Sequence, residues 1–148
     1  MEQKEINHIN VDCSTKNLKK IRAFVANTLE DRGIEDNDLN LIVLAVDEVC
    51  ANLIIHSNIC NENQQLRLSI KFTQNPVGVL FEILDSGSLF DYKNYKEPDL
   101  KDIINERKRG SLGLILVRRI MDKIEFSREN NTNICRLYKR IDQALLNE

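Results

Sequence analysis

The stretch VDEVCANLIIHS, residues 46–57, combines the apolar spacing of a core helix with a row of polar side chains. Glu48, Asn52 and His56 recur every four residues, so on an α-helix they lie one below another along one face. Val49 and its apolar neighbours follow the spacing of a stripe that packs against a core. The stretch therefore predicts a half-buried helix whose polar row either faces solvent or carries chemistry.

The segments before this stretch predict one strand and two helices. Residues 5–13 alternate apolar and polar side chains, although imperfectly, as a strand does. Residues 14–33 have apolar side chains at helical spacing, with Ser14 or Thr15 as a cap and Gly33 as a stop. Residues 35–57 repeat this spacing, so the quoted stretch forms the later part of the second helix.

The segments after it predict two hairpins. Residues 66–72 and 79–87 alternate with a period of two, which indicates an antiparallel pair whose second strand ends at Asp85. Near the C-terminus, two further strand patterns are joined across Asn130 and Asn131, a pair typical of a hairpin turn.

A third helix and a long loop separate the two hairpins. Residues 111–124 return to helical spacing, whereas residues 86–110 carry many charges without clean periodicity, apart from a short helical turn in residues 99–107. Long loops in small domains are usually lids or binding loops. The order βααββ, loop, αββ predicts an α+β fold, a two-layer sandwich with a mostly antiparallel sheet and helices on one face.

Composition bounds the class of protein. The chain has 148 residues, of which 42% are hydrophobic and 30% charged, so we expect one soluble globular domain over residues 1–148. The net charge of −2 gives no global attraction to nucleic acid or to an anionic membrane. Any anionic ligand must therefore be bound locally.

The sequence also indicates the compartment. No run of 18 apolar residues is present and the first ten residues are polar, so we expect a cytoplasmic protein. The four cysteines are scattered without a C-x-x-C pair or a neighbouring histidine at ligand spacing, which favours reduced packing residues over a metal or redox site: Cys13, Cys50, Cys60 and Cys135.

The polar row could support catalysis. A carboxylate such as Glu48 can act as a general base. The amide oxygen of Asn52 is a hard ligand suited to a Mg²⁺ ion that keeps most of its waters and bridges to phosphate. The alternative is an exposed polar face without chemistry.

The stretch LDSGSLFD, residues 84–91, offers an acceptor at the end of a strand. Asp85 would be held at the sheet edge, and Gly87 would let a flat ligand approach the backbone. Such an acceptor suits the exocyclic amine of adenine. The alternative is an ordinary Asp-Ser-Gly turn.

The stretch RKRGSLGL, residues 107–114, leads into the third helix. Gly110 and Gly113 would leave backbone N–H groups open at a helix N-terminus, where the dipole favours an anion, and Lys108 and Arg109 add positive charge. The spacing fits neither a P-loop nor a Rossmann turn. The alternative is a glycine-rich hinge.

Together these stretches resemble the Bergerat-type ATP-binding fold of histidine kinases and gyrase B, and within it the anti-sigma-factor serine/threonine kinases of bacteria. VDEVCANLIIHS is similar to the family's E-x-x-x-N-x-x-x-H box, DSGSLFD to its D-x-G-x-x-F-D box, and RGSLGL to its R-G-G-L-G-L segment. The tail ENNTNICRLYKR resembles the closing hairpin. Departures from the family pattern are found at Asn58, Leu89 and Ser111.

The resemblance implies a role for each matching residue. Glu48 would be the general base, Asn52 would ligate Mg²⁺, and Asp85 would hold the adenine amine, with Gly87 allowing close approach. His56 closes the first box, and for its role we favour a local structural hydrogen bond over catalysis. The lid, which binds phosphate mainly through its backbone, would comprise Arg109, Gly110, Ser111, Leu112, Gly113 and Leu114.

The resemblance also implies an activity and partners. Such a kinase binds ATP with Mg²⁺, phosphorylates a serine or threonine on an anti-sigma antagonist and sequesters a sigma factor, which makes it a regulator of transcription. Relatives of this kind commonly act as dimers. Two alternatives stay open: an ATP-responsive regulatory module that holds a partner without phosphoryl transfer, and the catalytic half of a histidine kinase.

Overall fold

All the predicted strands join in one antiparallel sheet in the computed structural model, which describes residues 7–57, 61–75, 77–86 and 109–141. Every strand pair is antiparallel, and the spatial order is β1-β2-β3-β5-β4. The last hairpin therefore inserts its second strand beside β3 and leaves β4 at the edge. The strands are β1 (Asn7–Asp12), β2 (Gln65–Gln74), β3 (Val77–Asp85), β4 (Lys123–Glu129) and β5 (Thr132–Arg140).

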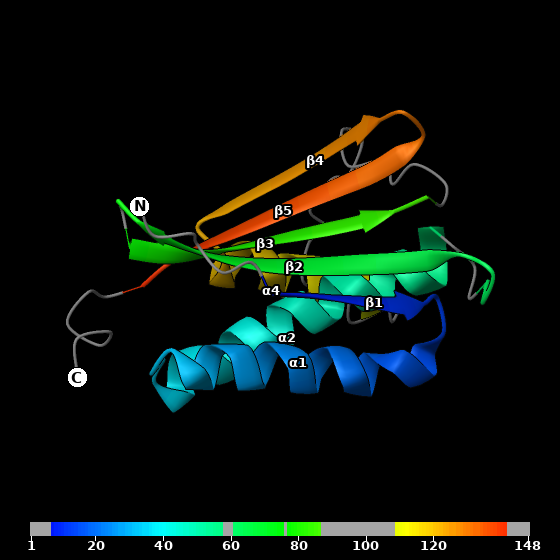
Figure 1. Ribbon diagram of the computed structural model, residues 1–148. Coiled ribbons are helices and arrows are strands. Elements are labelled where there is room, and N and C mark those ends of the chain that lie inside the picture. Colours follow the sequence, from blue (N-terminus) through cyan, green and yellow to red (C-terminus); the bar gives the residue numbers. More distant parts are fainter. Residues whose placement is uncertain (1–6, 58–60, 76, 87–108, 142–148) are drawn as a thin grey trace.

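The helices cover one face of this sheet (Figure 1). Three α-helices are described: α1 (Leu18–Asp31), α2 (Asp36–Asn52) and α4 (Arg109–Ile120). The predicted α+β two-layer architecture, with helices on one face, is confirmed. Between the layers lies a core of alternate strand residues and helix stripes, whose largest fully buried side chains include Phe81, Ile21, Leu29, Ile42, Ile54 and Leu137.

The first helix has the predicted glycine stop, and the predicted cap lies one short turn before the helix. Ser14 accepts a hydrogen bond from the backbone N–H of Lys16 at 3.3 Å and caps a 3₁₀ turn, Thr15–Asn17, that leads into α1. Gly33 has a φ of 76°, and its N–H donates to the carbonyl of Glu30, which ends the helix in a left-handed cap.

The second helix differs from its prediction at one point. The α-helical pattern stops at Asn52, and Leu53–Ser57 form a π-helix. A π-turn bonds residues five apart and is wider than an α-turn, so the regular α-helical spacing ends at Asn52. Of the predicted row, Glu48 and Asn52 lie on α2, whereas the side chain of His56 lies outside the description.

Both predicted hairpins are present, with the predicted strand end and turn. β3 ends at Asp85, opposite Leu66 of β2 and Asn133 of β5. Asn130 and Asn131 both have positive φ, 50° and 66°, which the two-residue turn of a twisted hairpin requires.

Part of the sequence analysis falls on residues outside the described ranges. The predicted loop of residues 86–110 is described only at Ser86, Arg109 and Gly110, and its short helical turn lies outside. Within the described ranges, no helix has the length and apolarity that crossing a membrane requires.

Candidate nucleotide site

Glu48 and Asn52 lie one turn apart on α2, and both are only partly exposed. The side-chain nitrogen of Asn52 is buried and has no hydrogen-bond partner among the described residues. Leaving a buried amide nitrogen without a partner costs about 1–3 kcal/mol. Such a group is stabilised when a polar ligand reaches it, so Asn52 has the chemistry of a binding residue.

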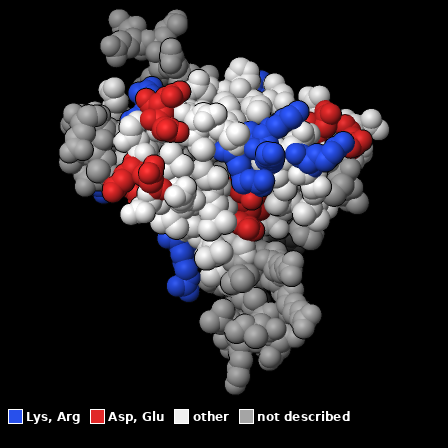
Figure 2. All heavy atoms as spheres, turned by 90° about the horizontal axis from the view of Figure 1, so that it is seen from below, with Lys and Arg blue, Asp and Glu red and all other residues white. Residues whose placement is uncertain are grey.

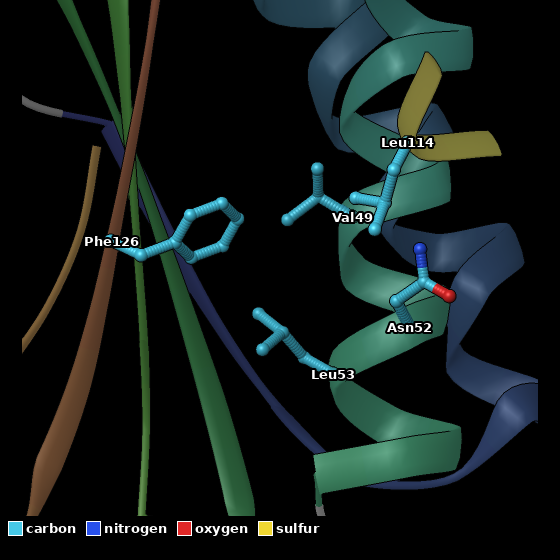
Figure 3. A pocket seen from close by; sticks show the side chains of 5 residues that line it. All are labelled: Val49, Asn52, Leu53, Leu114 and Phe126. Atoms are coloured by element: carbon cyan, nitrogen blue, oxygen red, sulfur yellow. The ribbon is translucent and has the colours of Figure 1, made fainter. Parts of the chain in front are cut away.

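Asn52 lines a small cavity between the helices and the sheet (Figure 3). Val49 and Leu53 of the same helical segment, Leu114 of α4 and Phe126 of β4 complete its wall. Its volume is about 10 Å³, roughly the room that one water molecule needs. The side chain of Leu114 points toward Val49 and Asn52, so α4 forms one wall of this cavity.

The start of α4 also covers Glu48. Gly113 packs so closely on Glu48 that a Cβ atom added there would overlap the carboxylate oxygen Oε2 and lie 3.1 Å from Cδ. Only glycine fits here without moving the glutamate. Gly113 is the fifth residue of α4, not at its start as predicted, so in this conformation its N–H belongs to the helical hydrogen-bond pattern.

The environment of Glu48 makes it a stronger base than an ordinary glutamate. Its pKa is raised above 4.5, first because burial penalises the charged form and then because Asp47 is a neighbouring negative charge. Asp47 itself pairs with Arg22 of α1, with 3.1 Å between Nη1 and Oδ1. A raised pKa suits a group that must take up a proton near neutral pH.

Asp85 lies at the predicted end of β3, and only 2% of its surface is exposed. Asn133, its partner in register on β5, donates from Nδ2 to Oδ1 of Asp85 at 3.0 Å. Arg128 in turn donates to Oδ1 of Asn133 at 2.8 Å. The aspartate is thus oriented by a chain of two side chains, neither of which was predicted.

Asp85 faces the helical layer and not the outer side of the sheet. Its alternate neighbours Ile83 and Phe81 are core residues. Its charge raises the pKa of the Cys135 thiol, after the larger effect of burial, and also contributes to the raised pKa of Cys50 on α2. Asp85 and Cys50 of α2 are thus both buried between the sheet and the helices.

The remaining predicted site residues divide into two groups. Gly87 lies outside the described residues. The backbone of residues 109–112 forms the first turn of α4, directly before Gly113 and Leu114, while the side chains of Arg109, Ser111 and Leu112 lie outside the description. The part of the chain that is described contains no cluster of three or more His, Cys, Asp or Glu that could hold a metal ion.

Comparison with known proteins assigns the family. A sequence profile described as the histidine kinase-like ATPase domain matches residues 12–139, which is most of the chain. The chain belongs to the histidine kinase-like ATPase family. This assignment agrees with the resemblance found in the three sequence stretches, each of which lies inside the matched range.

Curated members of the histidine kinase-like ATPase family similar to this chain include serine-protein kinases. The serine-protein kinase RsbW of Halalkalibacterium halodurans is 25% identical over 134 residues, which cover 88% of this chain and 80% of the relative. The RsbW of Staphylococcus aureus is 26% identical over 128 residues, 84% of this chain and 80% of the relative.

Two solved structures have the same fold. The crystal structure of the RsbU and RsbW domains of a Mycobacterium tuberculosis protein matches 92% of this chain with a TM-score of 0.63 and 14% identity, and the chain spans 32% of that longer one. The SiaB–SiaC complex of Pseudomonas aeruginosa matches 91% with a TM-score of 0.60 and 15% identity, over 89% of that chain. At such identities the likeness concerns the ATPase fold alone.

Proposed function

We propose that this chain is an ATP-dependent serine/threonine protein kinase of the anti-sigma type. The observation that carries the proposal is the pair on α2: a glutamate with a raised pKa, and one turn later an asparagine whose buried amide nitrogen has no partner among the described residues. Membership in the ATPase family and the similarity to serine-protein kinases support it.

Asn52 would hold Mg²⁺ through its amide oxygen. Rotation of the amide by 180° exchanges its oxygen and nitrogen, so the position now taken by the buried nitrogen can present an oxygen to a cation. The single amide ligand fits Mg²⁺, which takes few ligands from a protein and more from phosphate and water. The bound ion would neutralise the charge of the phosphates.

Asp85 would accept the exocyclic amine of adenine. Asn133 fixes one carboxylate oxygen, and a carboxylate has four acceptor positions, so the side chain can be oriented and still bind a base. Gly87 would allow the base to approach. The backbone of Arg109, Gly110, Ser111, Leu112, Gly113 and Leu114 would bind phosphate once Leu114 leaves the cavity beside Asn52.

In the reaction, Glu48 would take the proton from the hydroxyl of the target serine. The serine oxygen then forms a bond to the γ-phosphorus of ATP while the bond from that phosphorus to the bridging oxygen breaks, and ADP leaves with the electron pair. Phosphoryl transfer needs mainly positioning and charge neutralisation. The raised pKa of Glu48 favours proton uptake.

The target would be a serine or threonine on an anti-sigma antagonist, and the kinase would hold a sigma factor while that antagonist is phosphorylated. We further propose that residues 1–148 form one ATPase domain, that the protein works in the cytoplasm as a homodimer, and that it regulates transcription without contacting nucleic acid. The net charge of −2 supports the last point.

Incubation with radiolabelled ATP, Mg²⁺ and candidate antagonist proteins tests the proposal. We expect label on a serine or threonine of one antagonist, no nucleotide binding by Asn52→Ala, and binding without transfer by Glu48→Ala. Full transfer by Glu48→Ala would refute the base, and unchanged ATP affinity in Asn52→Ala would refute the site. Binding without any transfer by the unmodified chain would instead favour the ATP-responsive regulatory module.

A further inference from the structure

Two leucines on α2 are exposed, although most apolar residues of this helix are buried. Leu41 is 49% exposed and Leu44 is 40% exposed. Among the described residues, the only other large apolar side chain with comparable exposure is Ile55, at 42%. Single exposed leucines are common, whereas these two lie one turn apart on the same helix and form one small apolar patch.

This patch continues the face of α2 that carries Glu48. Residues 41, 44 and 48 follow the spacing i, i+3, i+7, so their side chains lie in line along one side of the helix. Gly113 covers Glu48 and Leu114 lies against Asn52, so α4 occupies the face on the C-terminal side. Leu44 lies one turn before Glu48 on the same side of α2, so a protein that contacts Leu44 can bring a hydroxyl close to Glu48.

The start of α2, on the N-terminal side of the patch, is acidic. Residues 33–66 contain no lysine or arginine, whereas five acidic residues lie on or next to α2: Glu35, Asp36, Asp38, Asp47 and Glu48. Figure 2, which views the molecule from below the helices, shows acidic side chains at the left end, where α2 begins in Figure 1, and both basic and acidic ones near the centre and at the right. Of the five acidic residues, Asp47 is paired with Arg22 of α1. Asp36 and Asp38 also stabilise the helix N-terminus.

We infer that the leucine patch, defined as Leu41 and Leu44, is the docking surface for the protein substrate of the proposed kinase. Its occupant is a protein surface that presents a serine or threonine beside apolar side chains, with lysine or arginine around them. The apolar side chains cover the two leucines, and the basic groups meet the acidic residues at the start of α2, which are Glu35, Asp36 and Asp38. This inference rests on the proposed function, because it assumes that the docked protein presents its hydroxyl group to Glu48.

Binding of short fluorescent peptides, measured by anisotropy without nucleotide, tests docking apart from catalysis. One peptide has a central serine between leucines and flanking lysines. A second has glutamates in place of the lysines, and a third has serines in place of the leucines. We expect the first peptide to bind at least about tenfold more tightly than either of the others. Equal binding of all three would overturn the inference.

The double variant Leu41→Ser/Leu44→Ser should weaken binding of the first peptide by about tenfold. Ile55→Ser is the matched control, because it removes an equally exposed side chain beyond the region that α4 covers. Affinity for ATP should be unchanged in both variants, which also shows that they fold. An equal loss in the control, or unchanged binding in the double variant, would contradict the assignment.

Steady-state kinetics and sedimentation distinguish substrate docking from a purely binding role and from dimer contact. With ATP and Mg²⁺, the double variant should raise KM for the first peptide and leave kcat nearly unchanged, as a docking defect does. Peptide binding that depends on the leucines without any transfer would refute the kinase and retain the docking surface. A change from dimer to monomer in sedimentation would assign the patch to contact between two copies and overturn the inference.

Discussion

At the scale of single residues, neighbouring carboxylates on α2 have different roles. Asp47 pairs with Arg22 across the helix interface, so its charge is compensated. Glu48 is partly desolvated beside that same aspartate, and its pKa is raised. A charge kept in such a place reduces stability, and residues of this kind are typically retained for function.

Glu48→Gln should therefore stabilise the protein at neutral pH by roughly 0.5 kcal/mol, the scale of a partly exposed site. The folded-state pKa of Glu48 is above its unfolded value of 4.5, so the folded protein binds more protons between these two pKa values and loses stability as pH rises through them. Urea denaturation at several pH values checks this. The variants should converge below pH 4.5, and a constant difference at every pH would contradict it.

At the scale of elements, the contact between α2 and α4 sets the geometry of the site. Gly113 lets the backbone of α4 rest on the Glu48 carboxylate, and Leu114 lines the cavity beside Asn52. One turn of α4 thus lies beside both candidate site residues of α2. A change in this turn should alter the site even when the fold is unchanged.

Gly113→Ala tests this contact. Alanine favours a helix interior over glycine by about 1 kcal/mol, but its Cβ would overlap the end of the Glu48 side chain and displace it. We expect little net change in stability and at least about a tenfold loss of phosphoryl transfer, since small displacements of a catalytic group are costly. Denaturation and transfer assays measure the two effects.

The same substitution in a protein that already carries Glu48→Ala tests whether the Glu48 side chain causes the effect. In Glu48→Ala the overlapping carboxylate is absent, so adding Gly113→Ala should then stabilise the protein by about 1 kcal/mol. Identical effects of Gly113→Ala in both backgrounds would show that Glu48 is not the group that alanine meets.

At the scale of the whole molecule, local sequence patterns predicted the helices, strands and turns. The order of the strands in the sheet depends on pairing between distant segments, which local patterns do not show. The cap at Ser14, the stop at Gly33 and the turn at Asn130 follow from local chemistry, and each was predicted. The placement of β5 beside β3 depends on contacts between distant segments, so the sequence could not indicate that Asn133 would hold Asp85. The π-turn after Asn52 has no simple sequence signal.

Nucleotide binding should be visible in the stability of the entire chain. A ligand that binds only the folded state at a hundred times its Kd adds about 2.7 kcal/mol, which for a domain of this size is a rise in Tm of roughly 5–10 °C. Thermal unfolding with ATP and Mg²⁺ measures the rise. Asn52→Ala should show no rise in Tm. An equal rise in that variant would mean that the nucleotide does not bind at Asn52 of α2.

The buried cysteine thiols can serve as probes of local unfolding in three parts of the protein. Cys13, Cys50 and Cys135 lie before α1, in α2 and in β5, and each is nearly inaccessible. Burial also raises the pKa of Cys50 and Cys135, which keeps them as thiols and not as the reactive thiolates. A reagent can alkylate each cysteine only after the surrounding region has locally unfolded. The three alkylation rates therefore report on the local unfolding of three different parts of the sandwich.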